Sequence, residues 1–204
     1  MGEVEEGDVV ISAVGTRLSF VVLVCLALVG CVAESHPGLV NVSNISNVSL
    51  YVAGGACHSE NGMPDPRCTP GAVSLAVTQD NINDTICKPN YSASIRPSSG
   101  YTNMLKRLQL GIDNKLVSGV GVYDYTDKNM SNYEEDHLIP LSLGGDPMDV
   151  KNLWPEYGDI PNDKDKVENI CHRMVCNGSM TLVEAQQEIV ANWHIACGGT
   201  GYGN

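Results

Sequence analysis

Two neighbouring residues, Asp136 and His137, combine side-chain types that together could carry out hydrolysis. A neutral imidazole, with a pKa of about 6.5, can take a proton from water close to neutral pH. Carboxylate oxygens are ligands that Mg²⁺ and Mn²⁺ prefer, and such a cation stabilises the negative charge that develops during hydrolysis. The pair therefore has the side-chain types that metal-dependent hydrolysis requires.

The geometry of a strand sets a condition on this pair. Neighbouring residues on a regular strand point to opposite faces, so Asp136 and His137 can face one cation only if the strand bends or bulges there. On a regular strand, Glu135 and His137 would share a face instead. We therefore expect a bulge at residues 136–137, with Glu135 as the reserve ligand if the strand is regular.

Two strands and a helix would position these residues. Residues 133–145 are predicted to form a strand that ends in a turn at Gly144 and Gly145, and residues 151–155 a second short strand. Residues 163–176 are predicted to be helical, because apolar side chains recur there at positions i, i+3, i+4 and i+7. These side chains are Val167, Ile170, Cys171 and Met174.

Further helices are expected on either side of this unit. Residues 78–87, with Thr78 as the N-cap, and residues 99–109 are predicted to be helical. A last helix over residues 181–196 opens with a capping box of Thr181 and Glu184. We assign a packing role to this last helix.

The segment DHLIPLSLGG, followed by NLWP, resembles the signature of HNH (His-Me finger) endonucleases, D-H-[IL]-x-P-hydrophobic-x-x-G-G and then N-L. The continuation KDKVENICHRMVC looks like a group of small exported HNH-like proteins. The resemblance covers roughly residues 66–194 and is sharp within 134–176. It implies an α+β fold: a ββα-metal finger of hairpin plus helix, at about 133–177, embedded in a mainly helical, disulfide-bridged small domain.

The same resemblance implies an activity and residue roles. The activity would be metal-dependent hydrolysis of phosphodiester bonds in DNA or RNA, with Mg²⁺ or Mn²⁺ and no small-molecule cofactor. His137 would be the general base and Asp136 a metal ligand. Asn152 matches an Asn that braces the loop and sometimes reaches the metal.

The third corner of the site departs from the family pattern. The family usually supplies a His or Asn early in the helix, whereas Pro161 and Asn162 stand at that place here. At 100° per residue, Lys164 and Glu168 flank the apolar stripe and could turn toward the hairpin. We predict Glu168 as the second metal ligand and Lys164 as a phosphate contact, with Asn162 and Asp165 as alternatives.

The N-terminal region predicts export. Residues 18–33 are apolar and uncharged, which is typical of a signal-peptide core and too short for an ordinary membrane span. Residues 28–31, LVGC, resemble a lipobox, in which Cys31 would carry a lipid anchor. We expect a signal peptide or membrane anchor over 1–33, a linker over 34–56, and one HNH-like domain over 57–204 in a secreted or envelope-attached protein.

Six cysteines follow the predicted signal: Cys57, Cys68, Cys87, Cys171, Cys176 and Cys197. An even number beyond an export signal predicts disulfides, and the absence of any CxxC pair argues against a zinc finger. The preferred pairing joins Cys68 to Cys87, which closes a short loop. At least one further bridge is expected to tie the last helix through Cys197.

The net charge of the chain leaves two interpretations of its function open. A net charge of −12 disfavours long-range attraction to nucleic acid, although a bound cation and basic residues such as Arg96 and Lys106 could reverse the sign locally. The first interpretation is a secreted or envelope nuclease, and the second an exported HNH-fold structural or binding module with weak or lost catalysis.

N-x-S/T sequons predict glycosylation in a glycosylating pathway; they begin at Asn41, Asn44, Asn47, Asn83, Asn90, Asn129 and Asn177.

Overall fold

The computed structural model describes residues 56–158 and 161–199. The chain divides into two units, 1–48 and 49–204, and the first lies wholly outside the described residues. The predicted signal peptide or anchor, Cys31 and nearly all of the predicted linker therefore also lie outside them. Among the residues that the structure describes, no helix is both long and apolar enough to cross a membrane.

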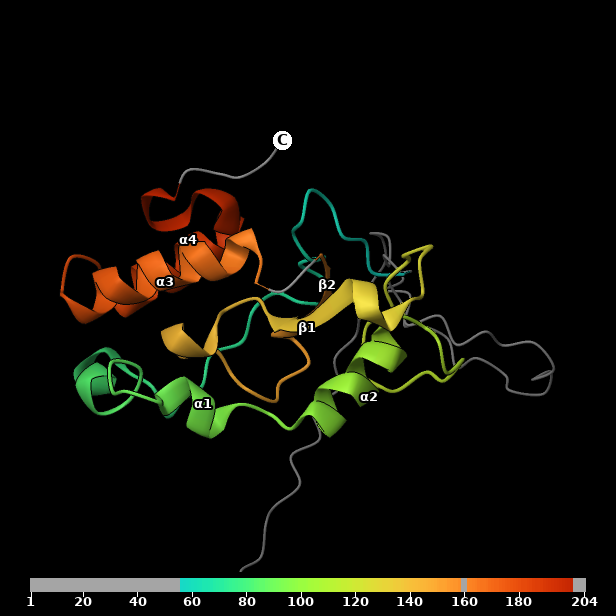
Figure 1. The fold of residues 1–204 in the computed structure, drawn as a ribbon, viewed down its shortest axis with the longest axis horizontal. Coiled ribbons are helices and arrows are strands. Elements are labelled where there is room, and N and C mark those ends of the chain that lie inside the picture. The colour runs from blue at the N-terminus through green and yellow to red at the C-terminus, as the bar shows by residue number, and fades with distance from the viewer. Residues whose placement is uncertain (1–55, 159–160, 200–204) are drawn as a thin grey trace, which may run out of the picture. The chain divides into compact units, whose positions relative to one another are not determined.

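The described residues combine helices with a two-stranded antiparallel sheet, which confirms the α+β class. The strands are β1 (Tyr133–His137) and β2 (Leu153–Tyr157), and the α-helices are α1 (Tyr91–Ile95), α2 (Ser99–Gln109), α3 (Asp163–Cys176) and α4 (Leu182–Asn192). Short 3₁₀ helices occupy Gln79–Asp84, Met130–Asn132, Leu141–Leu143 and Trp193–Gly198. Figure 1 shows the hairpin between α2 on one side and the pair α3 and α4 on the other.

The predicted helices differ in how well their ends match the structure. Both α2 and α3 have the predicted bounds, and α3 starts where the Asn162 side chain accepts a hydrogen bond from the backbone N–H of Asp165. The predicted capping box of Thr181 and Glu184 opens α4, but this helix ends at Asn192 and continues as a 3₁₀ helix. The segment 78–87 forms only the short 3₁₀ helix Gln79–Asp84.

The hairpin is regular, so the prediction of a bulge at residues 136–137 is wrong. Each residue of β1 pairs with one residue of β2, and the register runs through Asp136 opposite Trp154 and His137 opposite Leu153. Directly opposed residues of an antiparallel pair share a face. Asp136 therefore shares a face with Trp154, whereas Glu135 and His137 lie on the other face, as the alternative for a regular strand requires.

The two faces of the hairpin meet two different apolar clusters. Trp154 belongs to the main core, which α3 and α4 supply with Val167, Ala185 and Ile189 among others. Leu153, the next residue along β2, packs instead with Leu105 and Leu108 of α2 and with Val120. Each face of the strands thus has its own covering helix, and the polar residues of β1 are divided between them.

The loop between the strands depends on two glycines and one asparagine. Gly144 has a φ of 72°, and a Cβ on Gly145 would come within 1.8 Å of the carbonyl oxygen of Ile139. The Asn152 amide accepts from the N–H of Ile139 at 2.9 Å and donates to the Ile139 carbonyl at 2.9 Å. The Gly-Gly turn is therefore sterically required, and Asn152 braces the loop that follows His137.

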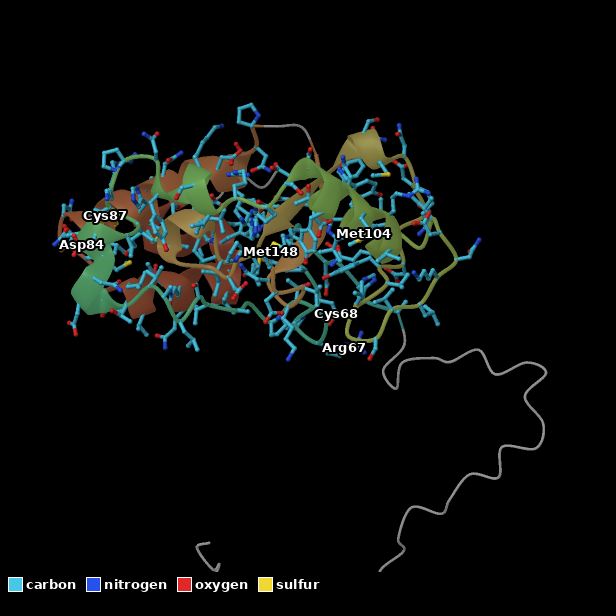
Figure 2. All side chains as sticks on the ribbon, turned by 90° about the horizontal axis from the view of Figure 1, so that it is seen from below. Arg67, Cys68, Asp84, Cys87, Met104 and Met148 are labelled. Carbon is cyan, nitrogen blue, oxygen red and sulfur yellow. A yellow bond between two sulfur atoms is a disulfide. The ribbon has the colours of Figure 1, made fainter. Side chains whose placement is uncertain are left out.

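Three disulfides join the six described cysteines: Cys57–Cys68, Cys87–Cys176 and Cys171–Cys197. The preferred pairing of Cys68 with Cys87 is wrong, and Figure 2 shows these two cysteines well apart in the domain. The expected tie through Cys197 is confirmed, because the Cys171–Cys197 bridge links α3 to the 3₁₀ helix after α4. The Cys87–Cys176 and Cys171–Cys197 bridges thus hold α3 to the segment before α1 and to the chain after α4, whereas Cys57–Cys68 closes a local loop.

Candidate functional site

An ammonium group occupies the α3 side of β1. Lys164 is fully buried, and its Nζ donates to Asp136 Oδ2 at 2.6 Å, to Glu168 Oε1 at 2.5 Å and to the backbone carbonyl of His137 at 2.8 Å. Glu156 lies opposite Glu134 in the register and adds another buried carboxyl group on this face. The structure thus brings together three of the predicted site residues, Asp136, Lys164 and Glu168, around one positive charge.

The charges in this Lys164 cluster explain the pKa shifts of its members. Burial alone would lower the pKa of Lys164, but the carboxylates of Asp136 and Glu168 outweigh it and raise that pKa. Burial would raise the pKa of Asp136, but Lys164 lowers it overall. Burial and the neighbouring charge of Asp136 raise the pKa of Glu156 to about 9, so Glu156 keeps its proton at neutral pH. Burial raises the pKa of Glu168 to about 7, an increase that Lys164 limits.

His137 lies on the opposite side of β1 with one ring nitrogen fixed. Its Nε2 is 3.1 Å from the carbonyl oxygen of Pro147, which can only accept, so Nε2 carries the proton of the neutral ring. The lone pair is then on Nδ1, which has no hydrogen-bond partner among the described residues. Burial lowers the pKa of His137, and the ring is therefore neutral at neutral pH. This is the protonation state that a general base needs.

Glu135 shares the face of His137 and has an unusual environment. Its side chain is 8% exposed, and neither carboxylate oxygen has a hydrogen-bond partner in the described part of the chain. Burial raises the pKa of Glu135 well above its ordinary value, an effect that the charge of Lys106 partly offsets. A buried carboxyl group without partners is costly, and in native proteins such a group calls for a ligand or a functional explanation.

A cavity of about 310 Å³ opens beside Glu135 and His137. One wall is a polar stripe of α2, in which Ser99, Thr102 and Lys106 recur at i, i+3 and i+7. The segment between α1 and α2 contributes Arg96 and Pro97, and β1 contributes Glu134, Glu135 and His137. The cavity therefore combines a neutral imidazole and two glutamates with two basic side chains.

The remaining predicted residues lie around these groups: Asn162 donates to Glu156 Oε2 at 3.2 Å, and Asp165 lines a cavity together with Glu168. Asn152 is fully buried, and its side chain makes hydrogen bonds to the backbone of the loop between the strands, including one to the carbonyl of Asp146 at 3.1 Å. The Asp165 carboxylate accepts from the N–H of Asn162 at 2.8 Å and so caps α3. Neither residue contacts Lys164 or His137 through a hydrogen bond within the described residues.

Sequence reasoning did not assign Ser99 and Thr102 to the site and counted Arg96 and Lys106 only as members of a diffuse basic patch. A signal was available in α2, because its polar stripe lies away from the buried Leu105 and Leu108. Nothing in the spacing, however, connected that stripe to a strand some thirty residues later.

The two faces of β1 differ in whether they fit a divalent cation. Between Asp136 and Glu168 the ammonium of Lys164 already supplies the positive charge, so these predicted ligands fit a metal ion poorly while Lys164 remains there. Glu135 fits better, because it lines the cavity and its two buried oxygens have no hydrogen-bond partner among the described residues. Carboxylate oxygens are ligands for Mg²⁺ or Mn²⁺ once the carboxyl group has lost its proton. The reserve ligand is thus the better candidate.

Comparisons with known proteins found no relative of this chain. No family model matches the chain, and neither a curated protein nor a solved structure matches it.

Proposed function

We propose that this protein hydrolyses phosphodiester bonds in nucleic acid, as an HNH-type nuclease with His137 as the general base. The observation that carries the proposal is the arrangement around His137: a neutral, buried imidazole with one nitrogen fixed, in a cavity with a partnerless glutamate and two basic side chains. The regular hairpin followed by α3 also agrees with the element order that the motif implies.

The residues of the cavity divide the chemical work. With Nε2 held by the Pro147 carbonyl, Nδ1 of His137 would accept the proton of the attacking water. Arg96 and Lys106 would hold the phosphate, to which guanidinium and ammonium groups bind strongly. Lys164 would act from behind the strand as a positioning residue, because its hydrogen bond to the His137 carbonyl fixes the end of β1.

Glu135 would hold the divalent cation, and Glu134 is the other acidic residue that lines the cavity. When bound, Mg²⁺ or Mn²⁺ would supply charge stabilisation for the pentacoordinate phosphate and the departing oxygen. A cation would also satisfy the two oxygens of Glu135 that otherwise have no partner.

A nicking assay tests this proposal. Supercoiled plasmid and a single-stranded RNA are each incubated with the protein and Mg²⁺ or Mn²⁺, with and without chelator, for the wild type and His137→Ala. We expect divalent-dependent cleavage that falls by at least about a hundredfold in His137→Ala, the scale of a lost general base. The matched control is His58→Ala, because His58 is exposed and pairs with Asp124 outside the cavity. Equal cleavage by the two variants would contradict the proposal.

One observation favours a second candidate function, an exported structural or binding module with weak or lost catalysis. Lys164 sits between the two acids predicted as metal ligands, so a cation site at Asp136 would be closed. This candidate predicts no divalent-dependent cleavage above background for either substrate, together with a folded protein that binds nucleic acid or another ligand without consuming it.

A further inference from the structure

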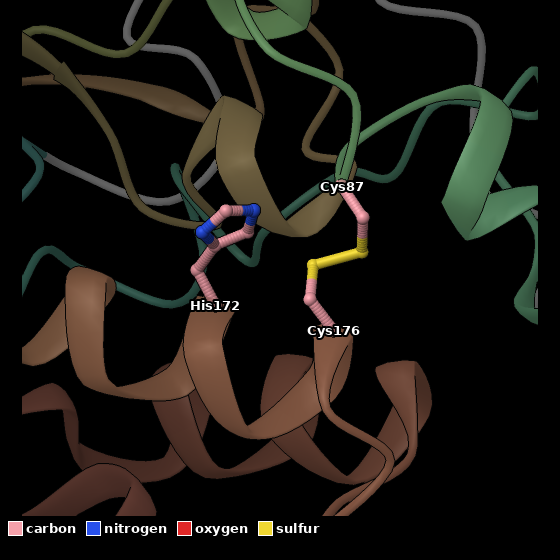
Figure 3. Close-up of side chains that lie close together, drawn as sticks. All are labelled: Cys87, His172 and Cys176. Carbon is pink, nitrogen blue, oxygen red and sulfur yellow. A yellow bond between two sulfur atoms is a disulfide. The ribbon is translucent and has the colours of Figure 1, made fainter.

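A second group of potential metal ligands lies at the far end of α3, away from the cavity of His137. Cys87 and Cys176 form a disulfide, and the imidazole of His172 lies beside this bridge (Figure 3). One ligand atom from each of the three residues lies within 4.8 Å of the other two. His172 and Cys176 are one helical turn apart on α3, at i and i+4, and so project from the same face.

We propose that Cys87, Cys176 and His172 form a zinc-binding site when the disulfide between the two cysteines is reduced. Two thiolates and one imidazole form a ligand set that binds zinc in preference to hard cations such as Mg²⁺. Tetrahedral zinc places neighbouring S and N ligand atoms roughly 3.5–3.8 Å apart, a spacing that side-chain rotation can reach once the S–S bond opens. The proposal does not depend on nuclease activity.

The local structure already holds the histidine in place. His172 Nε2 lies 2.9 Å from the carbonyl oxygen of Ile86, the residue that precedes Cys87. Because a carbonyl oxygen can only accept, Nε2 of His172 donates to the segment that carries one of the two cysteines. Metal binding through Nδ1 would keep this bond, and binding through Nε2 would exchange it for the metal.

The Cys87–Cys176 bridge is also the most accessible of the three. Both of its cysteines are half-buried, whereas Cys57, Cys171 and Cys197 are buried at 1%, 0% and 5% exposure, so each of the other bridges contains a buried cysteine. A thiol reductant breaks the S–S bond by exchange: two electrons and two protons convert the bridge to two thiols, and the reductant becomes a disulfide. Each thiol then releases its proton when zinc binds.

The three protein ligands leave a fourth position, and the surroundings indicate what would fill it. Cys87 and His172 line a cavity of about 550 Å³, together with the basic side chains of Lys88 and Arg96. Water has room there, and a small anion would be attracted by the two positive charges. An open fourth position is typical of zinc sites that exchange a ligand.

The test begins with mild reduction of the full chain by a phosphine or thiol reductant under argon. Alkylation and mass spectrometry identify which cysteines are free, and the protein is then titrated with Zn²⁺ or Co²⁺ and desalted. We expect one metal ion per chain with Cys87 and Cys176 free, and thiolate-to-cobalt absorption for the Co²⁺ form. Oxidised protein should retain none.

Two variants and one control assign the ligands. Cys87→Ser with Cys176→Ser should abolish retention, and His172→Ala should weaken it by at least about tenfold, as expected for the loss of a ligand. The control His194→Ala removes a histidine that contacts Asn61 instead, and should bind as the wild type does. Metal retention that is unchanged in His172→Ala, or no retention by reduced wild type, would overturn the proposal.

Unfolding during reduction gives an equally decisive result. If reduction opens all three bridges and the domain unfolds, zinc should restore the native far-ultraviolet circular dichroism of the wild type but not of His172→Ala, because metal binding then supplies folding free energy. No recovery with zinc, or equal recovery in both proteins, would count against the site.

Discussion

The two faces of β1 differ in whether their acidic side chains have hydrogen-bond partners. On the α3 face, Asp136 lies in a cluster where the ammonium of Lys164 donates to two acids, at 2.5 and 2.6 Å. On the α2 face, Glu135 has no hydrogen-bond partner and His137 borders a cavity. We call the α3 face, whose Asp136 is hydrogen-bonded, the saturated face, and the α2 face, whose Glu135 is not, the unsaturated face. The saturated face fixes the strand, whereas the unsaturated face retains polar groups that can bind a ligand.

The largest expected effect breaks the saturated face. Lys164→Met would leave Asp136 and Glu168, whose side chains are only 19% and 18% exposed, without their cation, and we expect the free energy of unfolding to fall by about 3–5 kcal/mol. Urea denaturation followed by circular dichroism measures the change. Lys166→Met is the matched control, because this exposed neighbour pairs with Asp163 and should change the stability by less than about 0.5 kcal/mol. Similar values for the two variants would show that the ammonium is not structural.

The next change, at Glu135 on the unsaturated face, should stabilise the fold but weaken the binding of a divalent cation. Glu135→Met removes a buried carboxyl group that lacks partners, so we expect the free energy of unfolding to rise by about 1 kcal/mol. The same change should weaken Mn²⁺ binding by about tenfold or more, measured by isothermal titration calorimetry, because Glu135 is the proposed ligand. Glu60→Met, at an exposed acid, should alter neither quantity. A loss of stability in Glu135→Met would mean that the carboxyl group serves the fold.

The acids of the saturated face also predict a dependence of stability on pH. Burial and the charge of Asp136 raise the pKa of Glu156 to about 9, so the folded state holds a proton that the unfolded state has released at neutral pH. Stability from this group is complete below about pH 4.5 and is lost as the pH rises through 9. We expect the free energy of unfolding to fall by roughly 1–2 kcal/mol between pH 7 and 9, and Glu156→Gln to remove most of that slope. If the free energy of unfolding of Glu156→Gln fell with pH as it does in the wild type, the proton that the folded state retains would belong to another group.

Local sequence signals located the elements that carry these two faces, but not all of their ends. The first strand ends at His137 rather than at residue 145, and the second spans Leu153–Tyr157 rather than 151–155. The apolar stripe predicted α3 with its observed bounds, and the alternation in β1 placed Glu135 on the face of His137 once the strand was taken as regular. The Gly144-Gly145 turn was visible because few other residues could occupy it. The neighbourhood of Lys164 and Glu168 to Asp136 followed from helical geometry.

Features that depend on distant packing could not be predicted in this way. The bulge was expected because the motif required Asp136 and His137 to face one cation, although β1 contains no glycine that would make a bulge easy to form. The role of α2 depends on Leu153 packing against Leu105, a contact between residues far apart in the sequence. The bridge from Cys87 spans 89 residues to Cys176, and spacing alone gave no reason to choose it. That Lys164 would be buried could be seen only when acids from both strands and α3 were placed around it.

The smallest expected effect tests whether the unsaturated face attracts phosphate. Arg96 is exposed, lines the cavities beside both His137 and Glu168, and makes no side-chain hydrogen bond or ion pair within the described residues. We expect Arg96→Ala to weaken binding of a DNA duplex by about threefold to tenfold, and to reduce the slope of log K against log salt by about 1. Fluorescence anisotropy in the His137→Ala background measures this without cleavage, with Lys115→Ala as the exposed-lysine control. Because the chain is acidic overall, binding that lost nothing in Arg96→Ala would mean that the bound cation, rather than these side chains, reverses the local charge.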